Sequence, residues 1–333
     1  MQTTLSKFIF DFPGRLVMPI GVYAGLDLTG DSVRRAVTDP VAQSRAVLAL
    51  HERLHTPVML TAMDLSAEAE AFGCAIRMPE DEIPTVTGRR VADLEAIAAL
   101  RDPQAGDGRT SVHLEACRRL VEESEGTPVL GGLIGPFSLA GRIFGVSEAL
   151  EATAADPEPI LALLEKTTRF LAAYAAAFRQ AGAAGIIMAE PAAGLLSPRS
   201  LAAFSAPFVR RIVEEVERPG FGVILHNCGA RLAHLPRVLE SGASIYHFGA
   251  PMDILAALAQ VDERTILCGN LDPSAVFQGG TPESVGQAAR ALLAGVGGRR
   301  NFVLSSGCDL PPHTPIANLE AFYQAAATEV ATT

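Results

Sequence analysis

Eight short apolar runs, separated by longer amphipathic stretches, constrain the fold of this chain more than any other feature. Runs that are apolar on both faces are typical of strands in a parallel sheet covered by helices. Eight such strands with crossover helices predict a (β/α)8 TIM barrel, with an open doubly wound sheet as the alternative. The runs are Leu16–Val22, Val58–Ala62, Val129–Ile134, Gly185–Ala189, Gly222–His226, Ser244–Phe248, Thr265–Gly269 and Phe302–Ser306.

Helix-start signals agree with this alternation. Asp39-Pro40, Ser197-Pro198 and Thr281-Pro282 each place a capping side chain before a first-turn proline. The connection between the second and third runs, about residues 64–126, is longer than one crossover requires and predicts an insertion near the barrel mouth. No stretch reads as a linker, so residues 1–333 are interpreted as one TIM-barrel domain.

Composition excludes several classes of partner. The net charge of −10 and the lack of a basic run argue against nucleic acid. The longest uncharged run, 127–141, is interrupted by Pro128 and Pro136 and is too short to cross a bilayer. Five cysteines without an export signal indicate reduced thiols in a cytoplasmic protein. Homo-oligomer formation stays open.

Two of the apolar runs end in residues that bind metals. His226 and Cys228 stand at i and i+2, so their side chains leave the same face of the strand Gly222–His226. Cys308 follows the last run in the same way. One imidazole and two thiolates suit zinc, and three protein ligands with an open position are typical of a catalytic site. The alternative is a buried histidine near inert core cysteines.

Other polar residues lie at the ends of predicted strands, where TIM barrels carry their catalytic groups. Asp64 is interpreted as a buried carboxylate or a helix cap, and Glu190 as a fourth zinc ligand, a base or a loop-capping group. His247 is within reach of a metal, but a histidine held by backbone groups is the preferred interpretation. For Cys268 we expect simple packing.

Four segments resemble the uroporphyrinogen decarboxylase superfamily, and within it the zinc-dependent methylcobamide:coenzyme M methyltransferases. The resemblance covers nearly the whole chain. The His-x-Cys pair with the distant Gly-Cys is typical of the methyltransferase branch, whereas the Gly-Asn-x-Asp-Pro element with Asn270 and Asp272 is common to the superfamily. The segments are Asp64–Gly73, His226–Gly229, Gly269–Pro273 and Ser306–Asn318.

This resemblance implies a TIM barrel that holds Zn²⁺ through His226, Cys228 and Cys308. Asp64 matches the catalytic aspartate of the superfamily and, together with Glu190 at its strand end, is a catalytic candidate. Asn270 and Asp272 of the shared Gly-Asn-x-Asp-Pro element are cofactor-binding candidates. A zinc-held thiol acceptor such as coenzyme M would take the methyl group of a methylcobamide. Since the sequence lacks an Asp-x-His-x-x-Gly cobalamin-binding signature, a separate corrinoid protein would present the methyl donor. Another thiol or a pterin is the alternative acceptor.

The resemblance leaves three points open. A decarboxylase of the same superfamily needs no metal, but the segment Gly21–Asp27 lacks the arginines that bind porphyrin carboxylates in that branch. A non-catalytic zinc- or corrinoid-binding partner is a further alternative. The methyltransferases have an acidic fourth ligand where this chain has Gly249-Ala250, which leaves water, Asp253 or Glu190 for that place.

Overall fold

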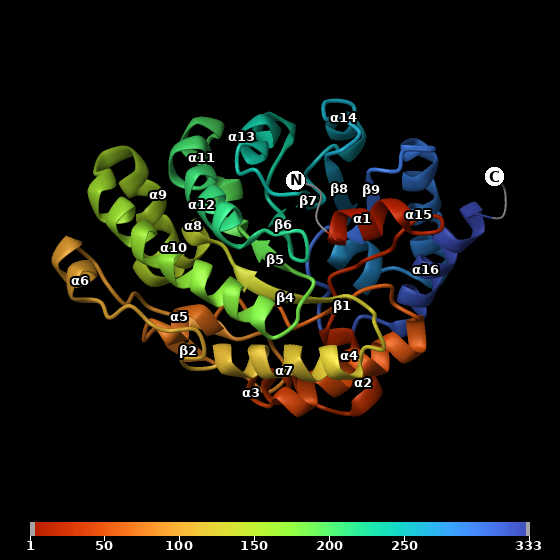
Figure 1. The fold of residues 1–333 in the computed structure, drawn as a ribbon, viewed down its shortest axis with the longest axis horizontal. Coiled ribbons are helices and arrows are strands. Elements are labelled where there is room, and N and C mark those ends of the chain that lie inside the picture. Colours follow the sequence, from red (N-terminus) through yellow and green to blue (C-terminus); the bar gives the residue numbers. More distant parts are fainter. Residues whose placement is uncertain (1–3, 331–333) are drawn as a thin grey trace.

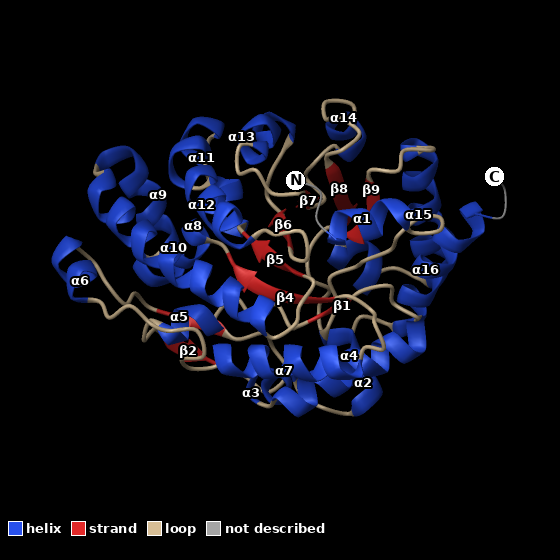
Figure 2. Ribbon diagram, in the orientation of Figure 1, coloured by secondary structure: helices blue, strands red, loops and turns tan. Residues whose placement is uncertain are grey.

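A curled, parallel seven-stranded sheet lies at the centre of the fold, and helices surround it (Figures 1 and 2). The computed structural model describes residues 4–330. The strand order is β1-β4-β5-β6-β7-β8-β9, so every neighbour in the sheet is also the next sheet strand along the chain. These strands are β1 (Met59–Leu60), β4 (Val129–Ile134), β5 (Gly185–Ala189), β6 (Gly222–Asn227), β7 (Ile245–Phe248), β8 (Ile266–Leu271) and β9 (Phe302–Ser306).

Helices connect the strands and form the outer layer of the molecule (Figure 2). The first half of the chain contains α1 (Thr4–Asp11), α2 (Leu26–Thr29), α3 (Val33–Thr38), α4 (Pro40–Leu54), α5 (Ala67–Ala71), α6 (Leu94–Ala99), α7 (Thr110–Glu123), α8 (Pro136–Phe144) and α9 (Val146–Ala155). The second half contains α10 (Pro157–Gln180), α11 (Pro198–Phe204), α12 (Ala206–Val216), α13 (Leu235–Leu239), α14 (Ile254–Leu258), α15 (Pro282–Val296) and α16 (Ile316–Val330). Short helical turns are η1 (Tyr23–Gly25), η2 (Pro191–Leu195), η3 (Leu232–His234) and η4 (Pro273–Gln278).

The segment 16–22, predicted as the first strand, differs from the expectation. It forms one isolated parallel bridge, Val17 to Leu304 of β9, instead of a regular strand. Pro19 has no N–H to donate, and the N–H of Ile20 is bound by the Ser306 side chain, so the ladder cannot continue. In the described residues no backbone hydrogen bond joins this segment to β1, so the architecture is a TIM-barrel-like sheet without a hydrogen-bonded closure.

The strands are buried because helices cover the sheet. Every residue of β4, β5, β6, β7 and β9 is buried, as expected for a parallel sheet in an α/β protein. At Gly131 in β4 a Cβ atom would overlap the ring of Phe178, so glycine is what lets α10 approach this strand closely. Buried side chains from Leu5 to Ala326 form one continuous hydrophobic core. The prediction of a single domain over residues 1–333 agrees with this core but stays a prediction.

The long connection between β1 and β4 contains more than a crossover helix. Besides α7 it carries α5, α6 and an antiparallel hairpin of β2 (Ala75–Arg77) and β3 (Thr85–Thr87). Ile83, Pro84 and Thr85 of this hairpin line the cavity at the carboxyl end of the sheet. The segment 64–126 therefore reaches the barrel mouth, while its origin as an insertion stays a prediction.

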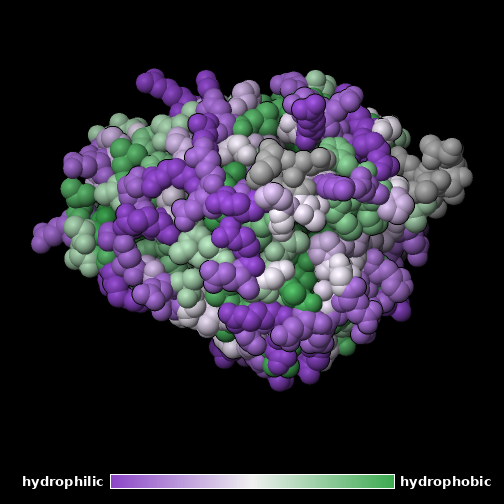
Figure 3. All heavy atoms as spheres, in the orientation of Figure 1, coloured by the Kyte–Doolittle hydropathy of each residue, from purple (hydrophilic) through white to green (hydrophobic). Residues whose placement is uncertain are grey.

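On the face shown in Figure 3, hydrophobic residues lie in small groups between hydrophilic ones. In residues 4–330, none of the helices has the length and apolar character needed to cross a membrane.

Candidate metal centre

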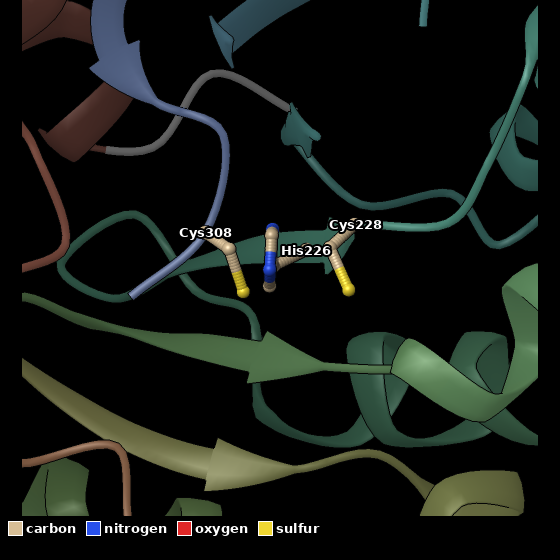
Figure 4. A group of neighbouring side chains, drawn as sticks. All are labelled: His226, Cys228 and Cys308. Atoms are coloured by element: carbon tan, nitrogen blue, oxygen red, sulfur yellow. The ribbon is translucent and has the colours of Figure 1, made fainter. Parts of the chain in front are cut away.

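His226, Cys228 and Cys308 converge at the carboxyl end of the sheet (Figure 4). His226 lies in β6, Cys228 follows directly after that strand, and Cys308 lies two residues beyond the end of β9. Their ligand atoms all lie within 4.8 Å of one another. Residues 82 positions apart in sequence meet here because parallel strands all end at the same edge of the sheet.

A chain of three hydrogen bonds fixes the orientation of the His226 ring. The Ser305 hydroxyl donates to the Met18 carbonyl oxygen at 2.6 Å, since a carbonyl can only accept. Ser305 Oγ must then accept from His247 Nε2–H at 2.8 Å. Burial lowers the pKa of His247 well below its usual value, so the ring is neutral and its Nδ1 is an acceptor. It accepts from His226 Nδ1–H at 2.8 Å.

The second ring nitrogen of His226 is left for a ligand. His226 Nε2 is buried and has no hydrogen-bond partner among the described residues. A buried nitrogen without a partner is costly unless a ligand satisfies it. A hydrogen bond to the other ring nitrogen orients histidine ligands in metal sites in this way. The orphaned nitrogen and its two cysteine neighbours therefore fit a zinc ion.

The two cysteines share one proton. The hydrogen bond donated by Cys308 lowers the pKa of Cys228 to about 7 and raises the pKa of Cys308 to about 12. Cys228 is thus the thiolate of the pair near neutral pH, which is the form that binds metals. The donor set of one imidazole and two cysteine sulfurs is a known zinc combination with an open fourth position.

The three candidate ligands line a mostly apolar cavity of about 190 Å³. Its walls come from the carboxyl edge of the sheet, from the β2–β3 hairpin and from α8. Two charged side chains, Arg142 and Asp309, also line it. Its further lining residues are Ile20, Met63, Leu65, Ile83, Pro84, Thr85, Ala189 and Pro191.

Asp64 lies beside this cavity but does not line it. Its neighbours Met63 and Leu65 line the cavity, whereas the buried carboxylate pairs with Arg109. The other oxygen, Oδ1, accepts from the Ser66 N–H at 3.0 Å and the Ser66 hydroxyl at 2.6 Å. Both oxygens of Asp64 are therefore occupied by protein donors.

Glu190 is also fully engaged. Its oxygens accept from the Phe137 N–H at 2.9 Å, the Ser138 N–H at 2.8 Å and the Ser138 hydroxyl at 2.6 Å. These N–H groups belong to the first turn of α8, where a negative charge is favoured by the helix dipole. Burial nevertheless raises the pKa of Glu190 above its usual value. The structure places Glu190 as a cap of α8 and outside the group of metal-binding atoms.

The other predicted residues hold loops. Asn270 donates to the Gly249 carbonyl at 3.0 Å and to the Met252 carbonyl at 2.7 Å. Asp272 caps η4, and Asp253 caps α14. None of the three lines the cavity.

Gly249 could not carry a fourth ligand. A Cβ atom at this position would overlap the carbonyl group of Cys228, so the loop after β7 lies directly on the metal-binding strand. Among the described residues, no carboxylate joins the His226–Cys228–Cys308 group.

Sequence reasoning missed four residues of this region. The preferred interpretation of His247 as held by backbone groups was wrong, because side chains bind both of its ring nitrogens. Arg109, Arg142 and Asp309 received no role. The signal for His247 was its predicted strand beside that of His226, but Arg109 and Arg142 have no sequence signature.

Fold and site together define a TIM-barrel-like α/β protein with a candidate His–Cys–Cys metal centre at the carboxyl edge of its sheet. The chain belongs to the uroporphyrinogen decarboxylase (URO-D) family, whose profile matches residues 21–328.

Relatives within this family include methyltransferases. The chain is 33% identical over 295 residues to the methylcobamide:CoM methyltransferase MtbA of Methanosarcina acetivorans, covering 86% of this chain and 85% of that protein. It is 28% identical over 254 residues to a uroporphyrinogen decarboxylase of Synechococcus sp., covering 68% and 70%. A solved structure of a methyltransferase from Methanosarcina mazei superimposes with a TM-score of 0.88 at 25% identity, covering 98% of both chains. The predicted resemblance to the methyltransferase branch is confirmed.

Proposed function

We propose that this protein is a zinc-dependent methyltransferase that moves a methyl group from a methylated corrinoid to a small thiol acceptor. The observation that carries the proposal is the group His226, Cys228 and Cys308, in which one buried nitrogen has no partner and three ligand atoms lie within 4.8 Å. The similarity to methylcobamide:CoM methyltransferases supports the same reaction class.

The chain's own residues prepare the site for a thiol. His247 holds the His226 ring through its Nδ1 and leaves Nε2 for a ligand, and Cys228 supplies a thiolate near neutral pH. The apolar walls of the cavity exclude water and strengthen charge interactions inside it. Zinc, when bound, lowers the pKa of a coordinated thiol and so provides a thiolate acceptor near neutral pH.

In the transfer itself, the acceptor sulfur attacks the methyl carbon. The carbon–sulfur bond forms as the cobalt–carbon bond breaks, and the electron pair of the broken bond stays on cobalt. The corrinoid is a substrate carried by a partner protein that would dock at the barrel mouth, beside the β2–β3 hairpin. A cytoplasmic location is part of the same proposal.

Asp64, Glu190, Asn270 and Asp272 enter the proposal as positioning residues. Their hydrogen bonds support a role in holding the loops and helix ends around the cavity. The sequence analysis assigned them direct catalytic or cofactor-binding roles, and those roles stay predictions.

Decarboxylation is the second candidate function, and the URO-D family match is the observation in its favour. Against it, the segment Gly21–Asp27 lacks arginines, and Asp64 is paired with Arg109. A non-catalytic zinc- or corrinoid-binding role would not require an open cavity beside the ligands.

Elemental analysis combined with a methyl-transfer assay tests the proposal. We expect about one zinc per chain in protein purified without chelator. The zinc-loaded protein should convert methylcobalamin to Co(I) only when a thiol is present, followed by the change in cobalamin absorbance. Bound zinc with no thiol-dependent demethylation of methylcobalamin or of a methylated corrinoid protein would contradict the proposed function.

A further inference from the structure

Arg142 places an uncompensated positive charge in the cavity that holds the candidate metal ligands. It projects from α8, and none of the residues described here gives it a hydrogen bond or an ion pair. The acidic group that influences it most, Asp64, is already paired with Arg109. A guanidinium is always charged and binds carboxylates or sulfonates through two parallel hydrogen bonds. An anionic group on a ligand would complete this contact.

Asp309 lies in the same cavity, next to Cys308, and also lacks a partner. Both of its carboxylate oxygens are buried without a hydrogen bond within residues 4–330. The N–H of the next residue, Leu310, donates to the Ile20 carbonyl oxygen at 2.7 Å. A buried carboxyl group without donors is costly, so a ligand with N–H donors would stabilise this arrangement. An ammonium group supplies three such donors.

We propose that the acceptor is a small zwitterionic thiol, with an anionic group bound by Arg142 and an ammonium group bound by Asp309. The inference rests on the proposed function, because the thiol of this acceptor would face His226, Cys228 and Cys308. The cavity of about 190 Å³ suits a small molecule. An acceptor with a sulfonate and no ammonium group would satisfy Arg142 but would leave Asp309 unpaired.

Binding of matched thiols to the zinc-loaded protein tests this inference without the corrinoid. The probes are homocysteine, 4-mercaptobutyrate, which lacks the ammonium group, and 3-mercaptopropylamine, which lacks the carboxylate. Coenzyme M serves as the sulfonate probe. Calorimetric titration should give homocysteine a Kd at least about tenfold lower than those of the other three, because each of them leaves either Arg142 or Asp309 without a partner group.

Two variants separate the roles of the charges. Arg142→Gln should weaken homocysteine and 4-mercaptobutyrate at least about tenfold while leaving 3-mercaptopropylamine unchanged. Asp309→Asn should weaken homocysteine and 3-mercaptopropylamine to a similar degree while leaving 4-mercaptobutyrate unchanged. Zinc content measured on the same samples shows whether either variant has lost the metal instead.

The outcomes separate this inference from the proposed function. Equal Kd values for all four thiols, or tightest binding of coenzyme M with no effect of Asp309→Asn, would overturn the inference and leave the thiol methyltransferase intact. Loss of zinc in Asp309→Asn would also overturn it, because Asp309 would then serve the metal. Absence of binding by every thiol to the zinc-loaded protein would overturn both.

Discussion

At the carboxyl edge of the sheet, the polar side chains near β1 and β5 differ from those near β6 and β9. The difference is whether protein groups already occupy their hydrogen-bonding atoms. On the side of β1 and β5, the oxygens of Asp64 and Glu190 are all occupied by protein donors. On the side of β6 and β9, His226 keeps an unpartnered nitrogen, and Cys228 and Cys308 share one proton. One side is a closed network, whereas the other leaves binding atoms open to a cavity.

This difference shows that a polar residue at a strand end is not necessarily a residue of the ligand-binding site. Asp64 and His226 lie at similar places in the fold, but only His226 has an atom left to bind something. The number of unsatisfied atoms that face the cavity separates a supporting residue from a candidate ligand.

Removal of a cysteine from the open side should have the largest effect. Cys228→Ala or Cys308→Ala leaves two protein ligands, which do not hold zinc tightly, so we expect complete loss of the metal and of methyl transfer. Elemental analysis of the purified variants measures this. Cys268→Ala is the matched control, because Cys268 is fully buried in the neighbouring strand β8 and should leave the zinc content unchanged. Zinc retained in both site variants would refute the ligand assignment.

Glu68 lies on the closed side, but one of its two carboxylate oxygens has no hydrogen-bond partner among the described residues. This group makes the free energy of unfolding depend on pH. Its Oε1 accepts from the Ile134 N–H at 3.0 Å, its Oε2 has no partner among the described residues, and burial raises its pKa to about 8. Because the folded pKa lies above the unfolded value of 4.5, this group's contribution is complete below pH 4.5 and is lost as pH rises to about 8.

The variant Glu68→Gln should remove this pH dependence. The two pKa values correspond to a difference of roughly 5 kcal/mol in the free energy of unfolding. Urea unfolding at pH 5 and at pH 8.5 should therefore show the variant gaining stability relative to the wild type at the higher pH. Parallel pH profiles for the two proteins would contradict a buried, neutral Glu68.

Replacement of Glu190, on the closed side, should lower the free energy of unfolding without releasing zinc. Glu190→Ala leaves the first-turn N–H groups of α8 without an acceptor in a buried place, so we expect a loss of about 3 kcal/mol in the free energy of unfolding. Denaturant unfolding measures this loss, and the folded variant should keep its zinc. If zinc were lost from a folded variant of unchanged stability, Glu190 would belong to the open side.

His247 has a hydrogen-bond partner on each ring nitrogen, and one of these bonds holds the candidate ligand His226. His247→Leu removes the acceptor of His226 Nδ1–H, so the zinc Kd should rise about 10- to 100-fold. Competition with a chromophoric chelator measures this Kd. His247→Gln offers an oxygen to His226 and an N–H to Ser305 and should recover part of the affinity. Equal zinc Kd values for wild type and His247→Leu would exclude the positioning role.

The sequence was enough to predict that the three candidate ligands lie close together, because strand ends of a parallel sheet share one edge. It was not enough to predict that every oxygen of the two carboxylates has a donor, because the donors other than Ser66 are distant in sequence. Asp64 meets Arg109, and Glu190 meets Ser138, through tertiary packing that no local pattern encodes. The irregular segment 16–22 was predicted as a strand since its apolar pattern outweighed Pro19.

The hydrogen-bonded chain from His226 to the Met18 carbonyl has a consequence for how the protein is made. Ser305, which links His247 to Met18, and Cys308 both follow β8 along the chain. A nascent chain that has left the ribosome only up to β8 therefore holds two of the candidate ligands and a His247 without its Ser305 partner. Under the proposed zinc binding, tight metal capture has to wait until the chain has been translated past Cys308.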